Sequence, residues 1–304
     1  MSRKTNVGLG LRRLLSFPRF LTREGGAAAA PSEGELLFEL TGGNPENRLF
    51  GRFDEDWVRG HLDQSGVFAG LARKGYPDPL VELSCADPDD QRIFLYAGER
   101  KRERLLLETR MQLCSFRPKN AIGPFTPDDA FRMLIIHWLV LSDPESGFNF
   151  KRPRLPGQQH PGLGLLPESL KLLRNIGRDL LIDGILDIPD HFHTAQFYAR
   201  TMRFFDPVAE GTFQAMMRDL SGIPLTLASE AVSEGAMVDA RTGEPFAWQP
   251  TEQILPVHGP LRRYFRSDRY LAQSGQAAHC TRVTIDWDLY RRKIALCATP
   301  ENYA

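Results

Sequence analysis

Arg154-Leu-Pro-Gly-Gln-Gln-His-Pro-Gly-Leu-Gly164 is an irregular stretch, rich in proline and glycine, that leads into a predicted helix beginning near Gly164. A short apolar run, Gly184-Ile-Leu-Asp-Ile188, follows that helix and predicts a buried strand. The next residues, 189–198, predict the start of another helix. The first amides of a helix have no partner within it, and the helix dipole favours negative charge there. The stretch therefore predicts an anion-binding site, with the other elements of the fold arranged around it.

Composition narrows the class of protein. The chain has 304 residues, 42% of them hydrophobic and 25% charged, which is ordinary for a globular protein. Its formal net charge of zero argues against a nucleic-acid partner. Four cysteines without a CxxC pair predict reduced thiols in a cytoplasmic protein. No apolar run approaches the roughly 18–20 residues of a membrane span.

The amino-terminal residues 1–33 predict a basic, flexible arm that ends in a Gly/Ala-rich linker. Leucines and phenylalanines alternate with the basic residues, so an amphipathic segment that contacts a membrane surface or directs targeting is the alternative. A flexible tail is the preferred interpretation. The segment also lacks the continuous apolar run of a secretory signal.

Three runs predict strands that short turns connect into an antiparallel meander: 80–85, 92–97 and 105–113. A helix is predicted before them, over Phe53 to Leu62. After them, Thr126-Pro-Asp-Asp129 is typical of a helix start, with a capping hydroxyl, an early proline and two acids. It predicts a buried helix over 126–142.

The carboxy-terminal part, residues 221–304, is predicted to be a β-rich extension of the same domain. Residues 234–257 have the character of a hairpin, and 282–287 and 293–297 predict final strands. A helix over 212–220 precedes this region.

The loop and the elements after it resemble the GCN5-related N-acetyltransferase (GNAT) family. Gln159-His-Pro-Gly-Leu-Gly164 is similar to the family's Gln/Arg-x-x-Gly-x-Gly/Ala pyrophosphate loop. The following helix, strand and helix continue the resemblance over roughly residues 148–207, with Tyr198 at the position of the family's tyrosine. The resemblance implies an α+β fold, with a mixed, mostly antiparallel central sheet flanked by helices, in a domain over residues 34–220. The family passes directly from one strand to the next where the helix at 126–142 is predicted, so that helix would be an insertion.

The resemblance also implies a reaction and its residues. The family's loop binds the pyrophosphate of acyl-CoA, which would be the co-substrate, and the acceptor would be a small-molecule or peptide amine. Gln159, Gly162, Leu163 and Gly164 would then bind CoA, and Tyr198 would protonate the leaving thiolate. His160 or His193 could lie beside the acyl group as a base, because an unperturbed imidazole titrates near neutrality.

Two alternatives stay open at the level of sequence. A GNAT-like chain without catalytic activity could bind a partner protein or an acyl ligand. A metal-dependent enzyme could instead use His160, His191 and His193, with Asp187 or Asp190 as a further ligand. The histidine spacing matches no common metal motif, and helix capping explains His191 and His193 as well as catalysis does.

Overall fold

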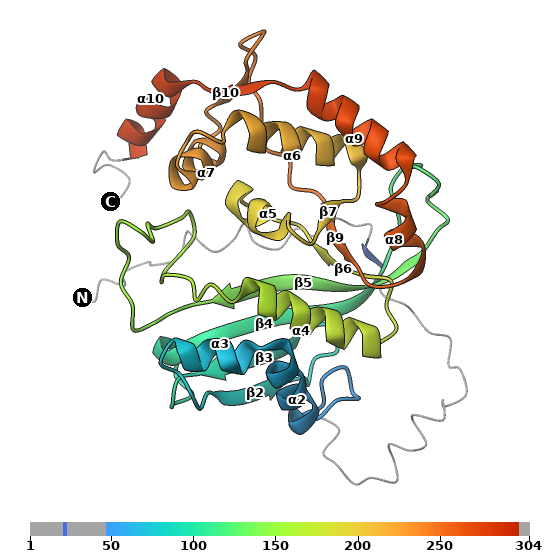
Figure 1. Cartoon of the computed structure of the whole chain (residues 1–304), viewed down its shortest axis with the longest axis vertical. Helices are drawn as coiled ribbons and strands as arrows, with labels where there is room; N and C mark the ends of the chain where they lie inside the picture. Colours follow the sequence, from blue (N-terminus) through green and yellow to red (C-terminus); the bar gives the residue numbers. More distant parts are fainter. Residues whose placement is uncertain (1–20, 23–46, 298–304) are drawn as a thin grey trace, which may run out of the picture.

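The computed structural model describes residues 21–22 and 47–297, so most of the predicted amino-terminal arm and linker, 1–33, lies outside the described residues. The fold is α+β, as predicted, with a mostly antiparallel open sheet and a separate two-stranded sheet. The main sheet has the strand order β2-β3-β4-β5-β6-β9-β7, and the short β1 (Leu21–Thr22) pairs with the end of β4. Figure 1 shows helices layered on this sheet and a group of carboxy-terminal helices beyond its far edge.

The predicted meander is present. β2 (Leu80–Ser84), β3 (Gln91–Tyr96) and β4 (Leu105–Phe116) pair in antiparallel order, and the 3-10 turn η2 (Arg102–Arg104) precedes β4. Buried and less buried residues alternate along β3, as expected for a strand with one face on the core. Helices α2 (Glu55–Ser65), α3 (Val67–Arg73) and α4 (Leu166–Asp179) cover that core. The helix predicted at Phe53–Leu62 is α2, with Asp54 capping it through the Trp57 amide.

The prediction of a helix over 126–142 is wrong. This segment contains β5 (Phe131–Leu141), which pairs with β4 along its length. Thr126 and Asp129 close a turn instead, because the Asp129 carboxylate accepts from both the amide and the hydroxyl of Thr126. Asp and Thr favour turns for the same reason that they favour helix caps. A run that is apolar on all sides fits a buried strand as well as a buried helix, and β4 supplies the missing backbone partners.

The prediction of a β-rich carboxy-terminal extension is also wrong. The region is mostly helical, with α7 (Leu225–Ser233), α8 (Gly259–Tyr264), α9 (Asp268–Cys280) and α10 (Trp287–Cys297). Residues 293–297 are helical because Asp286 accepts from the amides of Asp288 and Leu289 and so caps α10. β8 (Met237–Asp239) pairs with β10 (Val283–Ile285), whereas β9 (Gln253–Pro256) joins the main sheet. The expected hairpin over 234–257 therefore divides between two sheets.

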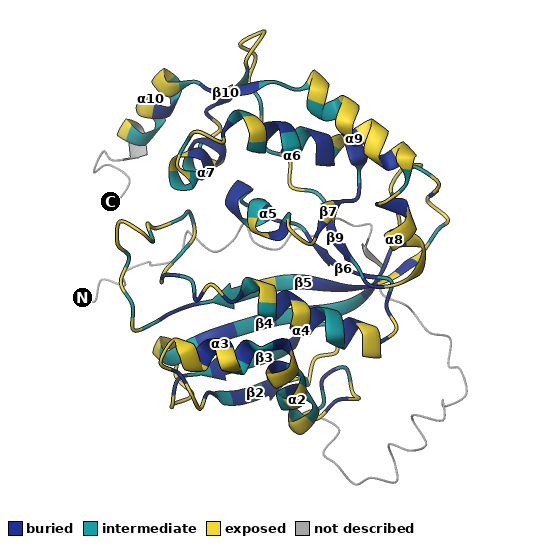
Figure 2. Ribbon diagram, viewed as in Figure 1, coloured by how far each residue is buried: buried dark blue, intermediate teal, exposed yellow. Residues whose placement is uncertain are grey.

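The two faces of the central strands support different cores (Figure 2). Leu134 and Ile136 of β5 belong to the core under α2, α3 and α4, whereas Met133 and Ile135 belong to an aromatic-rich core with residues of α8 and α9. A third core lies among α5 (Phe192–Tyr198), α6 (Pro207–Asp219), α7 and the small sheet. Among the described residues, no helix is both long and apolar enough to cross a membrane.

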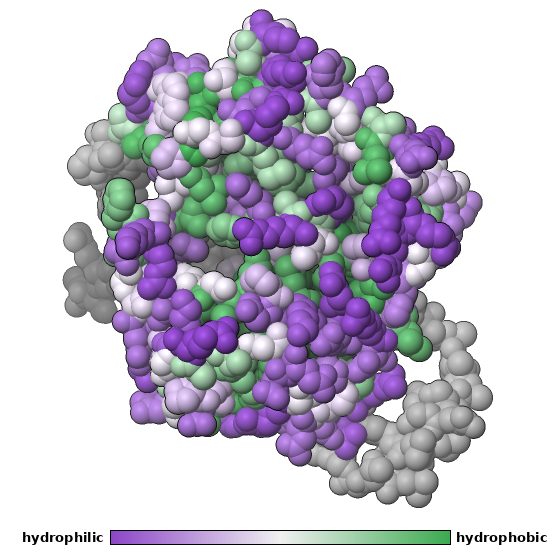
Figure 3. Space-filling view, viewed as in Figure 1, coloured by the Kyte–Doolittle hydropathy of each residue, from purple (hydrophilic) through white to green (hydrophobic). Residues whose placement is uncertain are grey.

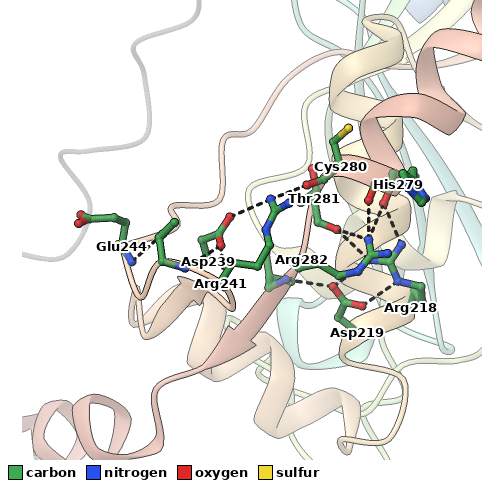
Figure 4. Close-up of polar contacts among 12 residues, drawn as sticks. Arg218, Asp219, Asp239, Arg241, Glu244, His279, Cys280, Thr281 and Arg282 are labelled. Atoms are coloured by element: carbon green, nitrogen blue, oxygen red, sulfur yellow. Dashed lines mark hydrogen bonds and ion pairs between the residues drawn. The ribbon is translucent and has the colours of Figure 1, made fainter.

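Arginines from three segments stabilise the carboxyl end of α9 (Figure 4). Arg218 of α6 donates to the carbonyl oxygens of Ala278 and Thr281, at 2.8 and 2.9 Å. Arg241 donates to the Cys280 carbonyl and Arg282 to the His279 carbonyl. The last carbonyls of a helix have no partner within it and carry partial negative charge, so cationic donors suit this position. These bonds connect α9 to α6 and to the small sheet.

Candidate active site

The candidate site lies beyond the point where the pairing of β5 with β6 (Gly184–Asp187) stops. These two strands are the only parallel pair among the strands that the structure describes. The two strands pair from Met133 with Gly184 to Ile135 with Leu186. β6 ends one residue later at Asp187, whereas β5 continues to Leu141. Both carboxyl ends lie at the same edge, which is where open sheets with parallel strands bind ligands.

Side chains along the second half of β5 are incompletely covered, although this strand is central in the sheet. A bulge at residue 137 shifts the register between Met111–Ile136 and Arg110–Trp138. Beyond it, Trp138 is 45% exposed, and Leu139 and Val140 are half-buried. Side chains of a central strand are normally covered, so the exposed Trp138 marks apolar surface near the end of β5.

The loop predicted to bind an anion lies at this end of β5. Residues 161–163 return alongside the end of β5, with the Asp143 amide donating to the Pro161 carbonyl and the Leu163 amide to the Leu141 carbonyl. Asp143 fixes the base of the loop, since its carboxylate accepts from Tyr76, Ser146 and Arg152. Burial disfavours the carboxylate, but these hydrogen bonds outweigh it and lower the pKa of Asp143.

Several amides of the predicted loop have no acceptor within the described part of the chain. They are the backbone N–H groups of Gln159, His160, Gly162 and Gly164, and these residues are exposed or half-buried. Gly164 has a φ of +71°, a conformation that favours glycine, and α4 begins at Leu166 with no side-chain cap. Leu163 differs, because its amide is paired and its side chain is 0% exposed in the core. It anchors the loop.

The loop also contacts the start of α5. A Cβ built on Gly157, whose φ is +78°, would lie 3.2 Å from Nε2 of His191. His191 stacks on His193, with ring centroids 5.2 Å apart. His193 is buried, and its Nδ1 lies 2.7 Å from the hydroxyl of Ser229 on α7. Burial, and then the neighbouring His191, lower the pKa of His193 to about 4, which keeps the imidazole neutral.

Asp187 and Tyr198 lie at the carboxyl end of β6 and on α5, close enough for the carboxylate to raise the pKa of the phenol. Burial is the larger cause of that rise, since Tyr198 is 4% exposed and belongs to the core under α4. Burial, and then Asp190, raise the pKa of the Asp187 carboxyl to about 8. The sequence pointed to Asp187 only as a possible metal ligand, because a single Asp in an apolar strand does not reveal its burial.

The alternative of a metal site at His160, His191 and His193 has no support among the described residues. His160 is exposed, whereas His193 is buried against Ser229. Within residues 47–297, no three His, Cys, Asp or Glu side chains gather into a set that could hold a metal ion.

A pocket of about 410 Å³ lies elsewhere, at the other end of the meander. Its lining includes Cys85, Asp89, Gln91, Cys114 and Arg132, and none of the predicted site residues. Buried Gln91 shapes this region, because its amide group bonds to Phe50 and to the carbonyls of Cys85 and Asp87.

Searches against protein-family models, curated proteins and solved structures found no match for this chain.

Proposed function

We propose that the protein is an N-acyltransferase that transfers an acyl group from acyl-CoA to an amine. One observation carries the proposal: the 159–164 loop, with its unpaired amides, runs alongside the end of β5, beyond the point where the parallel pairing of β5 with β6 stops. Such amides can donate to the oxygens of a pyrophosphate, and the exposed apolar surface at Trp138 suits the acyl-pantetheine part.

The strand at 131–141 supports the proposal further. The helix expected there would have been an insertion relative to the GNAT family, whereas a strand that leads into the loop agrees with the family pattern. This agreement is a resemblance of element order, and the chemistry still depends on the site.

In the reaction, the ionised Asp187 accepts a proton from the ammonium form of the acceptor. The neutral amine attacks the thioester carbonyl, and the C–S bond breaks. Tyr198, which its raised pKa keeps protonated, gives its proton to the leaving sulfur and takes the proton that the nitrogen loses as the amide forms, so CoA leaves as the thiol. His193 is neutral and fixed by Ser229, so it orients groups at the start of α5 rather than acting as the base. The exposed His160 contributes its amide to the loop.

Gly162→Asp tests the proposal. A Cβ on Gly162 would meet the Leu141 carbonyl at 3.6 Å, an ordinary contact, so the fold should tolerate the change. A carboxylate beside the loop amides should repel pyrophosphate and weaken acetyl-CoA binding by about tenfold or more in titration calorimetry. Gly147→Asp is the matched control, because a Cβ there meets nothing within 4 Å and the site is elsewhere in the same connection. Equal CoA binding by the two variants contradicts the proposal.

One observation favours a second candidate, an acyl-CoA-binding protein without catalytic activity: Tyr198 is almost fully buried. Assays of thiol release with an amine panel separate the two candidates. The transferase should show kcat/KM rising with pH to a plateau above about pH 8, as Asp187 ionises. Saturable CoA binding with no thiol release at any pH supports the binding protein.

A further inference from the structure

We infer that three arginines at the carboxyl end of α4 form a second anion site, which takes a phosphate group. Arg174 and Arg178 lie one turn apart on α4, and Arg262 lies on α8. Residues i and i+4 on a helix are neighbours, so like charges there repel each other unless an anion lies between them. The site goes beyond the proposed acyl transfer and does not depend on it.

Packing of α4 on the connection before α8 brings the three side chains together. A Cβ built on Gly177 would lie 3.4 Å from Cγ2 of Val257, which precedes α8 directly. Arg178 and Arg262 both act electrostatically on Arg174 and, after burial, lower its pKa. Figure 3 shows strongly hydrophilic side chains gathered over α8 and the adjoining end of α4.

Arg174 has a donor with no acceptor. Its Nε atom is buried and, within the described residues, bonds to nothing, which is costly for a charged group. Arg178 and Arg262 are exposed, and neither forms an ion pair with a described residue. The helix dipole would explain the cations in the last turns of the two helices, Arg178 of α4 and Arg262 of α8, but not Arg174.

The two acids that follow Arg178 in the sequence, Asp179 and Asp183, have other partners. Asp179 lies 3.1 Å from Nε2 of His61, and Asp183 accepts from the Arg132 amide at 2.9 Å. A dianionic phosphate matches three guanidinium groups that have no counterion in the described part of the chain, and it accepts from the planar donor edge of each. Arg174 is about 12 Å along α4 from Leu166, so this site is separate from the 159–164 loop.

The experiment is calorimetric titration of the full chain with inorganic phosphate, at an ionic strength held constant with chloride. Saturable binding of one phosphate is expected, and Arg262→Gln should weaken it by about tenfold. Arg73→Gln is the matched control: Arg73 is an exposed arginine in the last turn of α3, and its removal should change nothing. Equal phosphate affinity of the two variants, or no saturable binding by the wild type, overturns the inference.

Two further variants separate this site from the loop and test the role of Nε. If phosphate binds at the arginines, Gly162→Asp should keep this binding. If phosphate binds only at the loop, Gly162→Asp should lose the binding and Arg262→Gln should leave it unchanged. Arg174→Lys keeps the charge but removes the planar donor, so it should weaken binding, and unchanged affinity would overturn the assignment of Arg174. If that variant does not fold, the exposed Arg178→Gln takes its place. Tighter binding of phenyl phosphate than of inorganic phosphate would identify a phosphomonoester as the ligand, and the reverse order would identify the free anion.

Discussion

Burial gives Asp187 a protonation state that its residue type alone would not predict. An exposed aspartate has a pKa of about 3.9. At the end of β6, loss of solvation and then the nearby Asp190 raise the pKa of Asp187 to about 8. The folded protein therefore holds a proton on this side chain at pH values where the unfolded chain has released it.

This difference predicts how stability depends on pH. Between about pH 4 and 8 the folded state binds the extra proton, so the contribution of Asp187 to stability falls as the pH rises through this range. Asp187→Asn removes the ionisable group and should stabilise the protein at pH 9, on the order of 3 kcal/mol relative to wild type, with little effect at pH 4. Urea unfolding at both pH values measures it.

Asp190→Asn is the control for that measurement, because Asp190 is exposed on the same connection. It should show a much smaller gain at pH 9. A gain from Asp187→Asn that is the same at pH 4 and pH 9 would mean that Asp187 does not titrate as described. This stability measurement does not depend on acyl transfer. In an assay of acyl transfer, Asp187→Asn should abolish turnover.

At the scale of elements, the contact between α6 and α9 depends on one glycine. A Cβ built on Gly211 of α6 would lie 2.2 Å from the Ser274 carbonyl oxygen and 2.6 Å from the Ala277 Cβ. No side chain fits there without moving one helix, since much of the obstruction is backbone. The glycine therefore sets how closely the two helices approach.

Gly211→Ala should destabilise the protein by about 1–3 kcal/mol, the usual range for overpacking. Gly275→Ala is a matched change in α9, where a Cβ meets nothing within 4 Å, and should stabilise by about 0.5–1 kcal/mol through helix propensity. Thermal unfolding of both variants checks the pair. Similar melting temperatures for the two would contradict the close approach of α6 and α9.

At the scale of the whole molecule, Phe205 links distant parts of the chain. It is 1% exposed, and its ring contacts those of Phe116 on β4, Phe125, Phe131 on β5 and Tyr264 on α8. Edge-on and stacked contacts of this kind add to the free energy of burying apolar surface. The cluster holds the carboxy-terminal helices against the main sheet.

Phe205→Ala should lower the free energy of unfolding by about 3–5 kcal/mol, because it leaves a cavity where the sheet meets α8. Phe150→Ala is the control: Phe150 is 100% exposed, and its change should stay within about 0.5 kcal/mol. Denaturant unfolding followed by tryptophan fluorescence measures both. A loss in Phe205→Ala no larger than in Phe150→Ala would show that this cluster does not hold the molecule together.

Local signals were sufficient where one segment decides its own structure. The alternating residues of the meander predicted β2, β3 and β4, and the apolar stripe after Gly164 predicted α4. The glycine and proline loop before α4 is irregular, as expected, and the amides of Gln159, His160, Gly162 and Gly164 are unpaired within the described residues. In each case the periodicity or the backbone requirement lies within a few neighbouring residues.

Partners distant in sequence decided the rest. Residues 131–141 form a strand because β4 supplies backbone partners along their whole length, and β9 lies in the main sheet because β6 accepts it there. The raised pKa of Asp187 and the gathering of Arg174, Arg178 and Arg262 likewise depend on which segments pack together. Sequence by itself determined the strands of the meander, α4 and the irregular loop, because these follow from local periodicity and backbone chemistry. Only the tertiary structure decided strand partners, burial and charge neighbours, because desolvation and pairing depend on contacts between segments far apart in the chain.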